Sequence, residues 1–354
     1  MTALAAILAA RIAATGPISL ADYMADCLLH PQHGYYTTRT PFGSAGDFTT
    51  APEISQMFGE LLGLCLAQAW LDQGAPAPFT LAELGPGRGT LMADVLRATR
   101  GVPGFHDACS VTLVEASSAL RKVQRQTLGH HPVAWADSVN ALPDQPLFLL
   151  ANEFFDALPI RQFTRDSAGW AETMVGQHDG VLTLGRAPAA PLAALAHRLQ
   201  DTADGEVVEI CPAAAPIIAG LSARVAAHGG LALIVDYGGW HSRGDTFQAL
   251  RDHAFTDPLL APGEADLTAH VDFEALARAA APLAASYRPQ GAVLAALGIA
   301  QRADRLAARL EGEALSRHRA AERRLTHPQE MGELFKVLAL FPPAAPPPPG
   351  FAAA

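Results

Sequence analysis

Short apolar runs separated by glycine turns and amphipathic stretches predict a fold in which strands and helices alternate. We expect five buried strands, over residues 79–84, 111–114, 132–135, 146–151 and 231–235. Helical spacing of apolar residues follows the first two of them, over 90–96 and 116–128. Strands that alternate with helices form a largely parallel, doubly wound sheet with helices on both faces. The pattern therefore predicts an α/β protein with a Rossmann-like sheet.

This alternation is missing at both ends of the chain and once in the middle. We expect residues 1–78 to form an N-terminal helical and lid segment, and 79–340 to form the doubly wound domain. Between 160 and 206, short strand-like runs follow one another without helices, which predicts an inserted β-rich subdomain. Residues 341–354 are rich in alanine and proline, and we expect a disordered tail there.

The most informative stretch is residues 81–89, with the sequence LAELGPGRG. The first strand ends in three glycines at alternate positions, Gly85, Gly87 and Gly89, and a helix-like run begins at Thr90. Glycines let the backbone turn tightly and come close to a ligand, and a helix N-terminus offers unpaired N–H groups. A strand, a glycine turn and a helix in this order favour a nucleotide-like ligand. A tight turn without any ligand is the alternative.

The glycine spacing separates the candidate ligands. The third glycine comes one residue earlier than in the dinucleotide pattern G-x-G-x-x-G, which disfavours a nicotinamide oxidoreductase. A P-loop is excluded, because neither of the two lysines, Lys122 and Lys336, follows a glycine loop. The remaining pattern is an acid, Glu83, followed by alternating glycines. It resembles the S-adenosylmethionine loop of class I methyltransferases, in which this acid faces the amino acid end of the cofactor.

Polar residues also follow the later strands, where doubly wound sheets place their chemistry. Glu115, after the second strand, is placed to accept hydrogen bonds from ribose hydroxyls, although it could also stabilise the next helix N-terminus. Asp137, after the third strand, could meet an adenine amino group. The fourth strand ends in Asn152, Glu153 and Asp156, and two close carboxylates can grip a guanidinium group. The alternative for these three residues is a capping turn with solvated acids.

Composition narrows the classes of partner. The formal net charge is −10, which argues against a stably bound nucleic acid and suits a basic protein or peptide substrate. No apolar run reaches the length of a transmembrane helix, so no membrane insertion is expected. The four cysteines form no C-x-x-C pair and are typical of reduced thiols. The histidines and aspartates of residues 241–273 match no zinc spacing, so we expect no metal.

Over residues 12–340, the chain is similar to the MidA-like family of S-adenosylmethionine-dependent methyltransferases. Its mitochondrial members are complex I assembly factors described as protein arginine methyltransferases. The resemblance rests on nine segments: GPISLADYM (16–24), HGYY (33–36), GDFTTAPEISQMFGELLG (46–63), ELGPGRGTL (83–91), NEFFDALP (152–159), VDYG (235–238), GDTFQA (244–249), DPLLAPGEADLTAHVDF (257–273) and MGELFKVLAL (331–340).

The resemblance implies a cofactor, S-adenosylmethionine, and two sets of site residues. It places the cofactor on Glu83, Gly85, Pro86, Gly87, Gly89 and Glu115, with Asp47 and Glu53 in a loop that lines or closes the site. Asp137, proposed above from its place after the third strand, completes the candidate cofactor residues. It places NEFFDALP where arginine methyltransferases carry their paired acids, although the sequence differs from theirs. In this hypothesis Glu153 holds the substrate guanidinium, and Asp156 and Asn152 assist.

The same resemblance implies a protein substrate such as a respiratory complex I subunit. It also implies a role in assembly and a location in the bacterial cytoplasm, which corresponds to the mitochondrial matrix of eukaryotic relatives. A homodimer is left open. Two alternatives also stay open: a methyltransferase acting on another protein side chain or a small molecule, and a non-catalytic assembly factor that keeps the fold.

Overall fold

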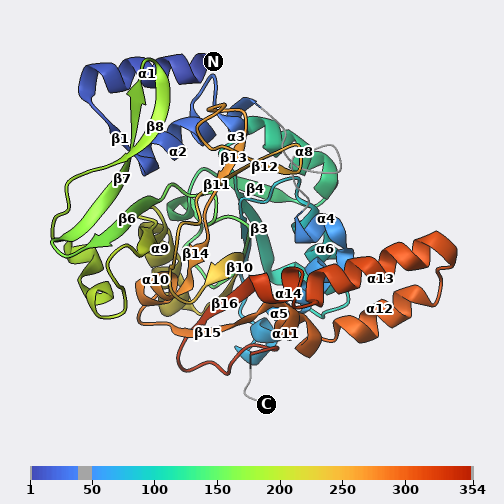
Figure 1. The fold of residues 1–354 in the computed structure, drawn as a ribbon. Helices are drawn as coiled ribbons and strands as arrows, with labels where there is room; N and C mark the ends of the chain where they lie inside the picture. Colours follow the sequence, from blue (N-terminus) through green and yellow to red (C-terminus); the bar gives the residue numbers. More distant parts are fainter. Residues whose placement is uncertain (1, 39–49, 352–354) are drawn as a thin grey trace. The chain divides into compact units, whose positions relative to one another are not determined.

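The computed structural model describes residues 2–38 and 50–351 (Figure 1). The chain divides into two compact units, which we call the accessory unit and the sheet unit. The accessory unit comprises Met1–Phe48, Phe155–Ala215 and Gly239–Asp272, and the sheet unit comprises Thr49–Phe154, Pro216–Gly238 and Phe273–Ala354. The described residues from Thr50 onward thus already belong to the sheet unit, whereas the sequence analysis expected the boundary at 78.

The sheet unit is built on a twisted, mostly parallel sheet. Its strand order is β15-β16-β10-β5-β2-β3-β4, and β16 runs antiparallel to both of its neighbours. The strands are β2 (Phe79–Leu84), β3 (Cys109–Val114), β4 (Val133–Ala136), β5 (Leu147–Asn152), β10 (Gly230–Gly239), β15 (Ala284–Pro289) and β16 (Phe335–Phe341). The strand order reverses between β2 and β5, which meet in the middle of the sheet. This arrangement confirms the doubly wound α/β fold.

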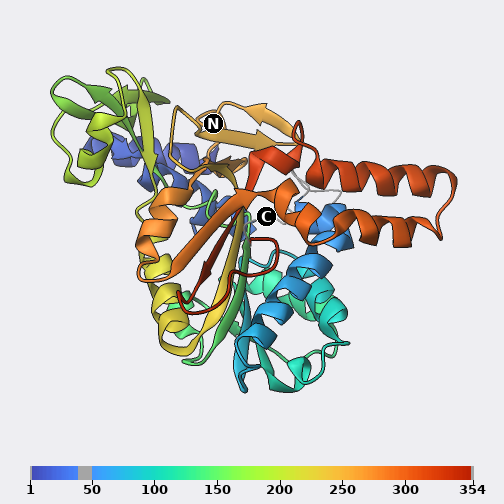
Figure 2. The same ribbon diagram turned by 90° about the horizontal axis from the view of Figure 1, so that it is seen from below.

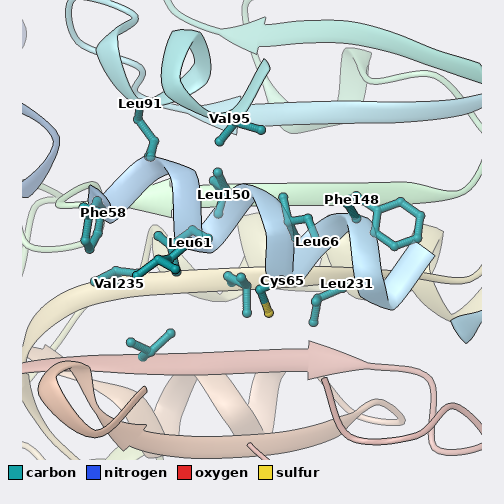
Figure 3. Close-up of a cluster of buried hydrophobic side chains, with 14 of the residues drawn as sticks. Phe58, Leu61, Cys65, Leu66, Leu91, Val95, Phe148, Leu150, Leu231 and Val235 are labelled. Carbon is teal, nitrogen blue, oxygen red and sulfur yellow. The ribbon is translucent and has the colours of Figure 1, made fainter. Parts of the chain in front are cut away.

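Helices α5 (Gln56–Asp72) and α6 (Thr90–Thr99) cover one face of this sheet. Figure 3 shows their contact with the strands, made by the side chains of Phe58, Leu61, Cys65, Leu66, Leu91, Val95, Phe148, Leu150, Leu231 and Val235. In Figure 2, α9 (Ala214–His228) and α10 (Phe273–Ala279) lie on the opposite side of the sheet. Alternate residues of a strand point to the same face. Glu83, two residues after Leu81, therefore shares the face that α5 and α6 cover.

Shorter helices complete the sheet unit. They are α4 (Ala51–Ile54), α7 (Phe105–Ala108), α8 (Ser118–Leu128), the 3₁₀ turn η1 (Val139–Ala141), α11 (Gln290–Ala296), α12 (Ile299–Ala307), α13 (Gly312–Thr326) and α14 (Met331–Leu334). The carboxylate of Glu60 on α5 is buried and ties this part together. It accepts hydrogen bonds from Arg97 on α6 and from Arg302 on α12. A buried carboxylate bound to two guanidinium groups is well compensated for its lost hydration.

The accessory unit combines N-terminal helices with antiparallel strands. Its main sheet has the order β1-β7-β6-β9, with β8 paired to β7, and a smaller sheet has the order β12-β11-β13. Its elements are α1 (Ala3–Thr15), β1 (Ile18–Ser19), α2 (Leu20–Leu29), α3 (Tyr35–Thr38), β6 (Arg161–Asp166), β7 (Gly169–His178), β8 (Val181–Arg186), η2 (Ala193–Gln200), β9 (Val207–Ile210), β11 (Gln248–Arg251), β12 (Ala254–Thr256), β13 (Asp266–Thr268) and β14 (Val271–Asp272). The β-rich region expected over 160–206 thus extends beyond both of those limits.

A buried carboxylate explains part of the GDTFQA segment. Glu209 accepts hydrogen bonds from the backbone N–H of Thr246 at 3.0 Å and from Gln162 at 3.0 Å, and Asp245 accepts one from the same Gln162. Burial raises the pKa of Glu209.

In the described ranges, no group of three or more histidines, cysteines or acids is arranged to hold a metal ion. None of the helices described there has the length and hydrophobicity of a membrane span.

The expectation of a disordered tail from residue 341 was wrong for its described part. Phe341 ends β16 within the sheet, and Phe351 is buried. The thiol of Cys65 donates a hydrogen bond to the carbonyl oxygen of Pro349, and Arg288 donates one to the carbonyl oxygen of Gly350. Proline has little conformational freedom to lose, so this segment packs at a low entropic cost.

We therefore expect Phe351→Ala to lower the free energy of unfolding by about 3 kcal/mol, because it removes a buried aromatic side chain. Pro347→Ala, at an exposed position in the same segment, is the control and should change it by less than about 0.5 kcal/mol. Chemical denaturation of the two variants measures both values. Equal stabilities would show that the segment contributes no packing.

Candidate cofactor site

Acidic and amide side chains gather at the carboxyl end of the central strands. In the sheet register, Glu83 of β2 lies opposite Leu113 of β3 and Leu150 of β5. Glu115 and Asn152 lie two residues beyond those partners, so the period of two places all three polar residues towards one face. In doubly wound sheets, ligands bind at this end, where the strand order reverses.

The glycine loop between β2 and α6 adopts a backbone that requires glycine. Gly85, Gly87 and Gly89 have φ values of 56°, 50° and 83°, in the left-handed region. A Cβ atom on Gly85 would also lie 2.8 Å from the ring of Phe154, which is closer than carbon atoms pack. The loop therefore presents bare backbone immediately before the N-terminus of α6, where the first N–H groups have no intrahelical partner.

Glu83 is a buried carboxylate beneath this loop. Its residue is 3% exposed, and its Oε2 atom has no hydrogen-bond partner among the described residues. Burial raises the pKa of Glu83 to about 8, and a hydrogen bond from the backbone N–H of Met92 offsets only part of that effect. A buried acceptor without a donor costs free energy, so such groups mark strain or a missing ligand.

Asn152 provides a second acceptor of the same kind. Its Oδ1 atom is buried and also lacks a hydrogen-bond partner in the described part of the chain. Two unsatisfied acceptors on one face, beside a helix N-terminus, suit a ligand with a donor group and a negative group close together. The amino acid end of S-adenosylmethionine has both groups, an ammonium and a carboxylate.

Glu115 is held in place by its neighbours. Its carboxylate accepts hydrogen bonds from the N–H of Ser117 at 2.7 Å and from Nε2 of Gln124 at 3.2 Å. Burial raises the pKa of Glu115. The bond from Ser117 supports a structural role for Glu115 at the start of α8. The ribose role stays a prediction.

Gln124 connects three parts of the site, and sequence reasoning missed it. Besides Glu115, its side chain binds the carbonyl oxygen of Gly87 at 2.9 Å and accepts a hydrogen bond from Trp135 Nε1 at 2.8 Å. Its position carried a signal, because Gln124 lies between Leu120 and Leu128 on the buried face of α8. A polar residue on a buried helix face indicates a specific partner.

Asp137 lies in a more open environment. Its side chain is 87% exposed and forms an ion pair with Arg121 at 2.5 Å. Arg121 also donates a hydrogen bond to the carbonyl oxygen of Glu115. The guanidinium carbon of Arg125 lies 4.5 Å from the centre of the Trp135 ring. Asp137 thus borders the polar end of the sheet, and its adenine contact stays a prediction.

Glu53 reaches the start of α6 from α4. It accepts a hydrogen bond from the hydroxyl of Thr90 at 2.6 Å, and it lies 3.6 Å from Arg88 of the glycine loop. These contacts place Glu53 beside the glycine loop, and the expectation that its loop lines the site stays a prediction. Asp47, the other acid expected there, lies outside the described residues.

Glu153 has an unusual backbone. Its φ is 50°, in the left-handed region that residues other than glycine rarely adopt. Its Oε1 atom accepts hydrogen bonds from the N–H of Ala51 at 3.3 Å and from the amide of Asn152 at 3.1 Å. Such strain is retained where function demands a particular geometry, at a cost of about 1–3 kcal/mol. Glu153 therefore holds the first residue of α4 at the edge of the site.

Asp156, the proposed partner of Glu153, belongs to the accessory unit. It is buried, and its carbonyl oxygen accepts a hydrogen bond from the N–H of Ala269. Within that unit, the negative charges of Asp266 and Asp156 contribute, after burial, to a raised pKa of Tyr36. The hypothesis that Glu153 and Asp156 form one paired-acid site stays a prediction.

Comparison with known proteins identifies the ligand class. A family model described as "Putative S-adenosyl-L-methionine-dependent methyltransferase" matches residues 61–290. The chain belongs to this family. The matched region contains the glycine loop, Glu115 and the Asn152–Glu153 pair, which together form the polar end of the sheet. Membership confirms the expected enzyme class and its cofactor, S-adenosylmethionine.

Similarity to named relatives extends over nearly the whole methyltransferase chain. This chain is 39% identical over 361 residues to a human protein named "Protein arginine methyltransferase NDUFAF7, mitochondrial". The match covers 94% of this chain and 82% of that protein. The cattle protein of the same name is 38% identical over 360 residues, with the same coverage. A crystal structure from Burkholderia thailandensis, bound to S-adenosyl-homocysteine, is 31% identical, with a TM-score of 0.82 over 99% of this chain and 93% of that one.

The residues present fit the cofactor of the methyltransferase family. S-adenosylmethionine supplies an electrophilic methyl group on a sulfonium centre. Glu83 and Asn152 would accept hydrogen bonds from its ammonium group, and the first N–H groups of α6 would hold its carboxylate. The glycine loop lets the backbone come close, and Glu115 would bind the ribose. Two unsatisfied acceptors, Glu83 Oε2 and Asn152 Oδ1, support this placement.

The raised pKa of Glu83 predicts a dependence of stability on pH. The pKa is about 8 in the folded protein against the usual 4.5, so folding favours the protonated carboxyl group. Wild-type stability relative to Glu83→Gln should fall between about pH 5 and pH 8, by at most about 1.4 kcal/mol per pH unit. Denaturation of both proteins without cofactor, at pH 5.5 and pH 8, measures the difference. A constant difference would mean that Glu83 is ionised throughout.

Proposed function

We propose that this chain methylates an arginine side chain of a protein substrate, such as a subunit of respiratory complex I, and thereby acts in the assembly of that complex. One observation carries the proposal: proteins named as arginine methyltransferases match 94% of the chain at 38–39% identity. The net charge of −10 also suits a basic acceptor. We place the reaction in the bacterial cytoplasm, and the relatives are named as mitochondrial.

In this proposal, the chain's main contributions are binding, alignment and exclusion of water. A guanidinium group is protonated at neutral pH and is a poor nucleophile. Glu153 would bind two of its N–H groups and localise the positive charge, so that the third nitrogen can attack. The new bond joins that nitrogen to the methyl carbon, the carbon–sulfur bond breaks, and sulfur keeps the electron pair. The methylated nitrogen then releases a proton to solvent.

Three features of the sheet unit support a role for Glu153. It follows β5 directly, at the end of the sheet where the candidate cofactor residues gather. Its backbone is strained, because its φ of 50° lies in the left-handed region. Asn152 donates a hydrogen bond to Glu153, which fixes the orientation of its carboxylate. Asp156 would assist by adding negative charge near the acceptor.

The test is product analysis by mass. The purified protein is incubated with S-adenosylmethionine carrying an isotope-labelled methyl group and with complex I subunits from the same organism. The proposal predicts label in methylarginine after complete hydrolysis. Label on another amino acid or on a small molecule would favour the first alternative. Absence of any transfer by a protein that binds the cofactor would favour a non-catalytic assembly factor.

For Glu153→Gln we expect methyl transfer to fall by about 10²–10³-fold, because a neutral amide cannot localise the guanidinium charge. Affinity for S-adenosyl-homocysteine should stay within about twofold, since the amide oxygen can still accept the hydrogen bond from Ala51 N–H. Single-turnover kinetics and calorimetry separate the two effects. Wild-type turnover by this variant would remove Glu153 from the chemistry.

A further inference from the structure

A helical hairpin in the sheet unit carries positive charge on an acidic chain. Helices α12 and α13 lie side by side and extend away from the sheet in both views (Figure 1, Figure 2). Residues 299–327 contain seven arginines and four acids, a net charge of +3, whereas the whole chain has −10. The hairpin is therefore a basic segment in a chain whose other residues carry a net charge of −13 (−10 minus +3).

Two contacts fix how the helices face each other. Nε2 of His318 on α13 lies 2.9 Å from the carbonyl oxygen of Ala303 on α12, so these two positions face one another. Arg319 and Asp304, one residue further along each helix, form an ion pair at 2.7 Å. Because α12 and α13 run antiparallel, the residues directly after Ala303 and His318 lie on one side of the hairpin. The residues directly before them lie on the opposite side.

The side of the hairpin that carries the residues before these facing positions is rich in arginine, and we call it the arginine face. Arg302 and Arg317 each come directly before a facing position. Residues three, four or seven positions after Arg302 or Arg317 lie on the same side of their helix, so arginines at these positions belong to the arginine face. Arg309 belongs to this set because a hydrogen bond from its N–H to the carbonyl oxygen of Leu306 continues the helical turn. The arginine face consists of Arg302, Arg305, Arg309, Arg317 and Arg324.

Only part of this charge is neutralised within the chain. Arg302 binds Glu60, and Arg317 forms an exposed pair with Glu313. Over the described ranges, Arg305, Arg309 and Arg324 form no ion pair. Like charges at this spacing destabilise a helix by about 0.2–0.5 kcal/mol per pair. The arginine face is therefore unfavourable for the hairpin alone, and an external negative group would remove the cost.

We propose that the arginine face docks an acidic segment of the protein that carries the methyl acceptor. The inference rests on the proposed function, because it assigns that substrate a second contact remote from the acceptor arginine. Guanidinium groups bind carboxylates through two parallel hydrogen bonds, which suits acidic side chains. A basic contact on the same unit as an acidic site would let one substrate present arginine to the site and carboxylates to the hairpin.

The composition of the hairpin disfavours other anionic partners. Residues 299–327 contain no phenylalanine, tyrosine or tryptophan, although single-stranded nucleic acids stack on such rings. None of the isoleucine or leucine side chains of residues 299–327 is exposed, so the hairpin offers none of them for insertion into a membrane interface. A long polyanion would extend beyond the hairpin and be repelled by the negative charge of the remaining chain. A short acidic segment is repelled only by charges within about 8 Å of it, because salt screens the more distant ones.

The test uses a fluorescein-labelled, glutamate-rich peptide of about twenty residues, with fluorescence anisotropy as the readout and no cofactor present. The variant is Arg305→Glu/Arg309→Glu/Arg324→Glu. The matched control is Arg100→Glu/Arg186→Glu/Arg243→Glu, which reverses three exposed arginines outside the hairpin and changes the net charge equally. Thermal unfolding checks that both variants fold.

We expect the hairpin variant to weaken peptide binding by at least about tenfold, which corresponds to about 1.4 kcal/mol. The control variant should change it by less than twofold, and a glutamine version of the peptide should not bind. Equal loss in both variants would overturn the proposal. So would tighter binding of a DNA oligonucleotide or of phosphatidylserine vesicles, or a change of oligomeric state in the hairpin variant alone. Because no methyl transfer is measured, failure of the arginine-methylation hypothesis leaves this result interpretable.

Discussion

The structure depends on a carboxylate buried at the end of a buried strand. Every residue of β2 is buried, and Glu83 is its penultimate residue. Burial raises its pKa to about 8, and one of its oxygens lacks a donor among the described residues. An isolated strand would not tolerate this cost, so the surrounding elements must impose it. The core between the sheet and α5 and α6 supplies the stabilising packing. A bound ammonium group would satisfy the same carboxylate.

The remainder of the site follows from this arrangement. The three left-handed glycines turn the chain above Glu83 and start α6 there. Gln124 then links the loop to Glu115, and Glu53 binds Thr90 at the first turn of α6. These links between protein groups restrict the backbone and side chains of the candidate site, which reduces the ordering cost of binding. Pre-organisation of this kind suits an enzyme whose cofactor provides the reactive group.

Local patterns predicted the strands, the glycine loop and the acids after the strands, because each depends on a short stretch of sequence. Features that depend on distant contacts could not be predicted in the same way. Neither the left-handed backbone of Glu153 nor its bond to Ala51 is encoded near residue 153. The antiparallel strand β16 pairs with strands far away in sequence. Composition was misleading for the Pro-rich tail, where one buried phenylalanine anchors the segment. Gln124 was detectable from its place on a buried helix face, but its three partners were not.

The most direct test of the account is calorimetric titration with S-adenosyl-homocysteine of the wild type, Gly87→Leu and Gly129→Leu. Both glycines have positive φ, 50° and 59°, but Gly129 ends α8 in open space, so it controls for backbone strain. The account predicts wild-type and Gly129→Leu dissociation constants on the order of micromolar, and binding at least about 100-fold weaker for Gly87→Leu. Unchanged binding by a folded Gly87→Leu protein, or no binding by the folded wild type, would contradict the assignment of the glycine loop and Glu83 to the cofactor.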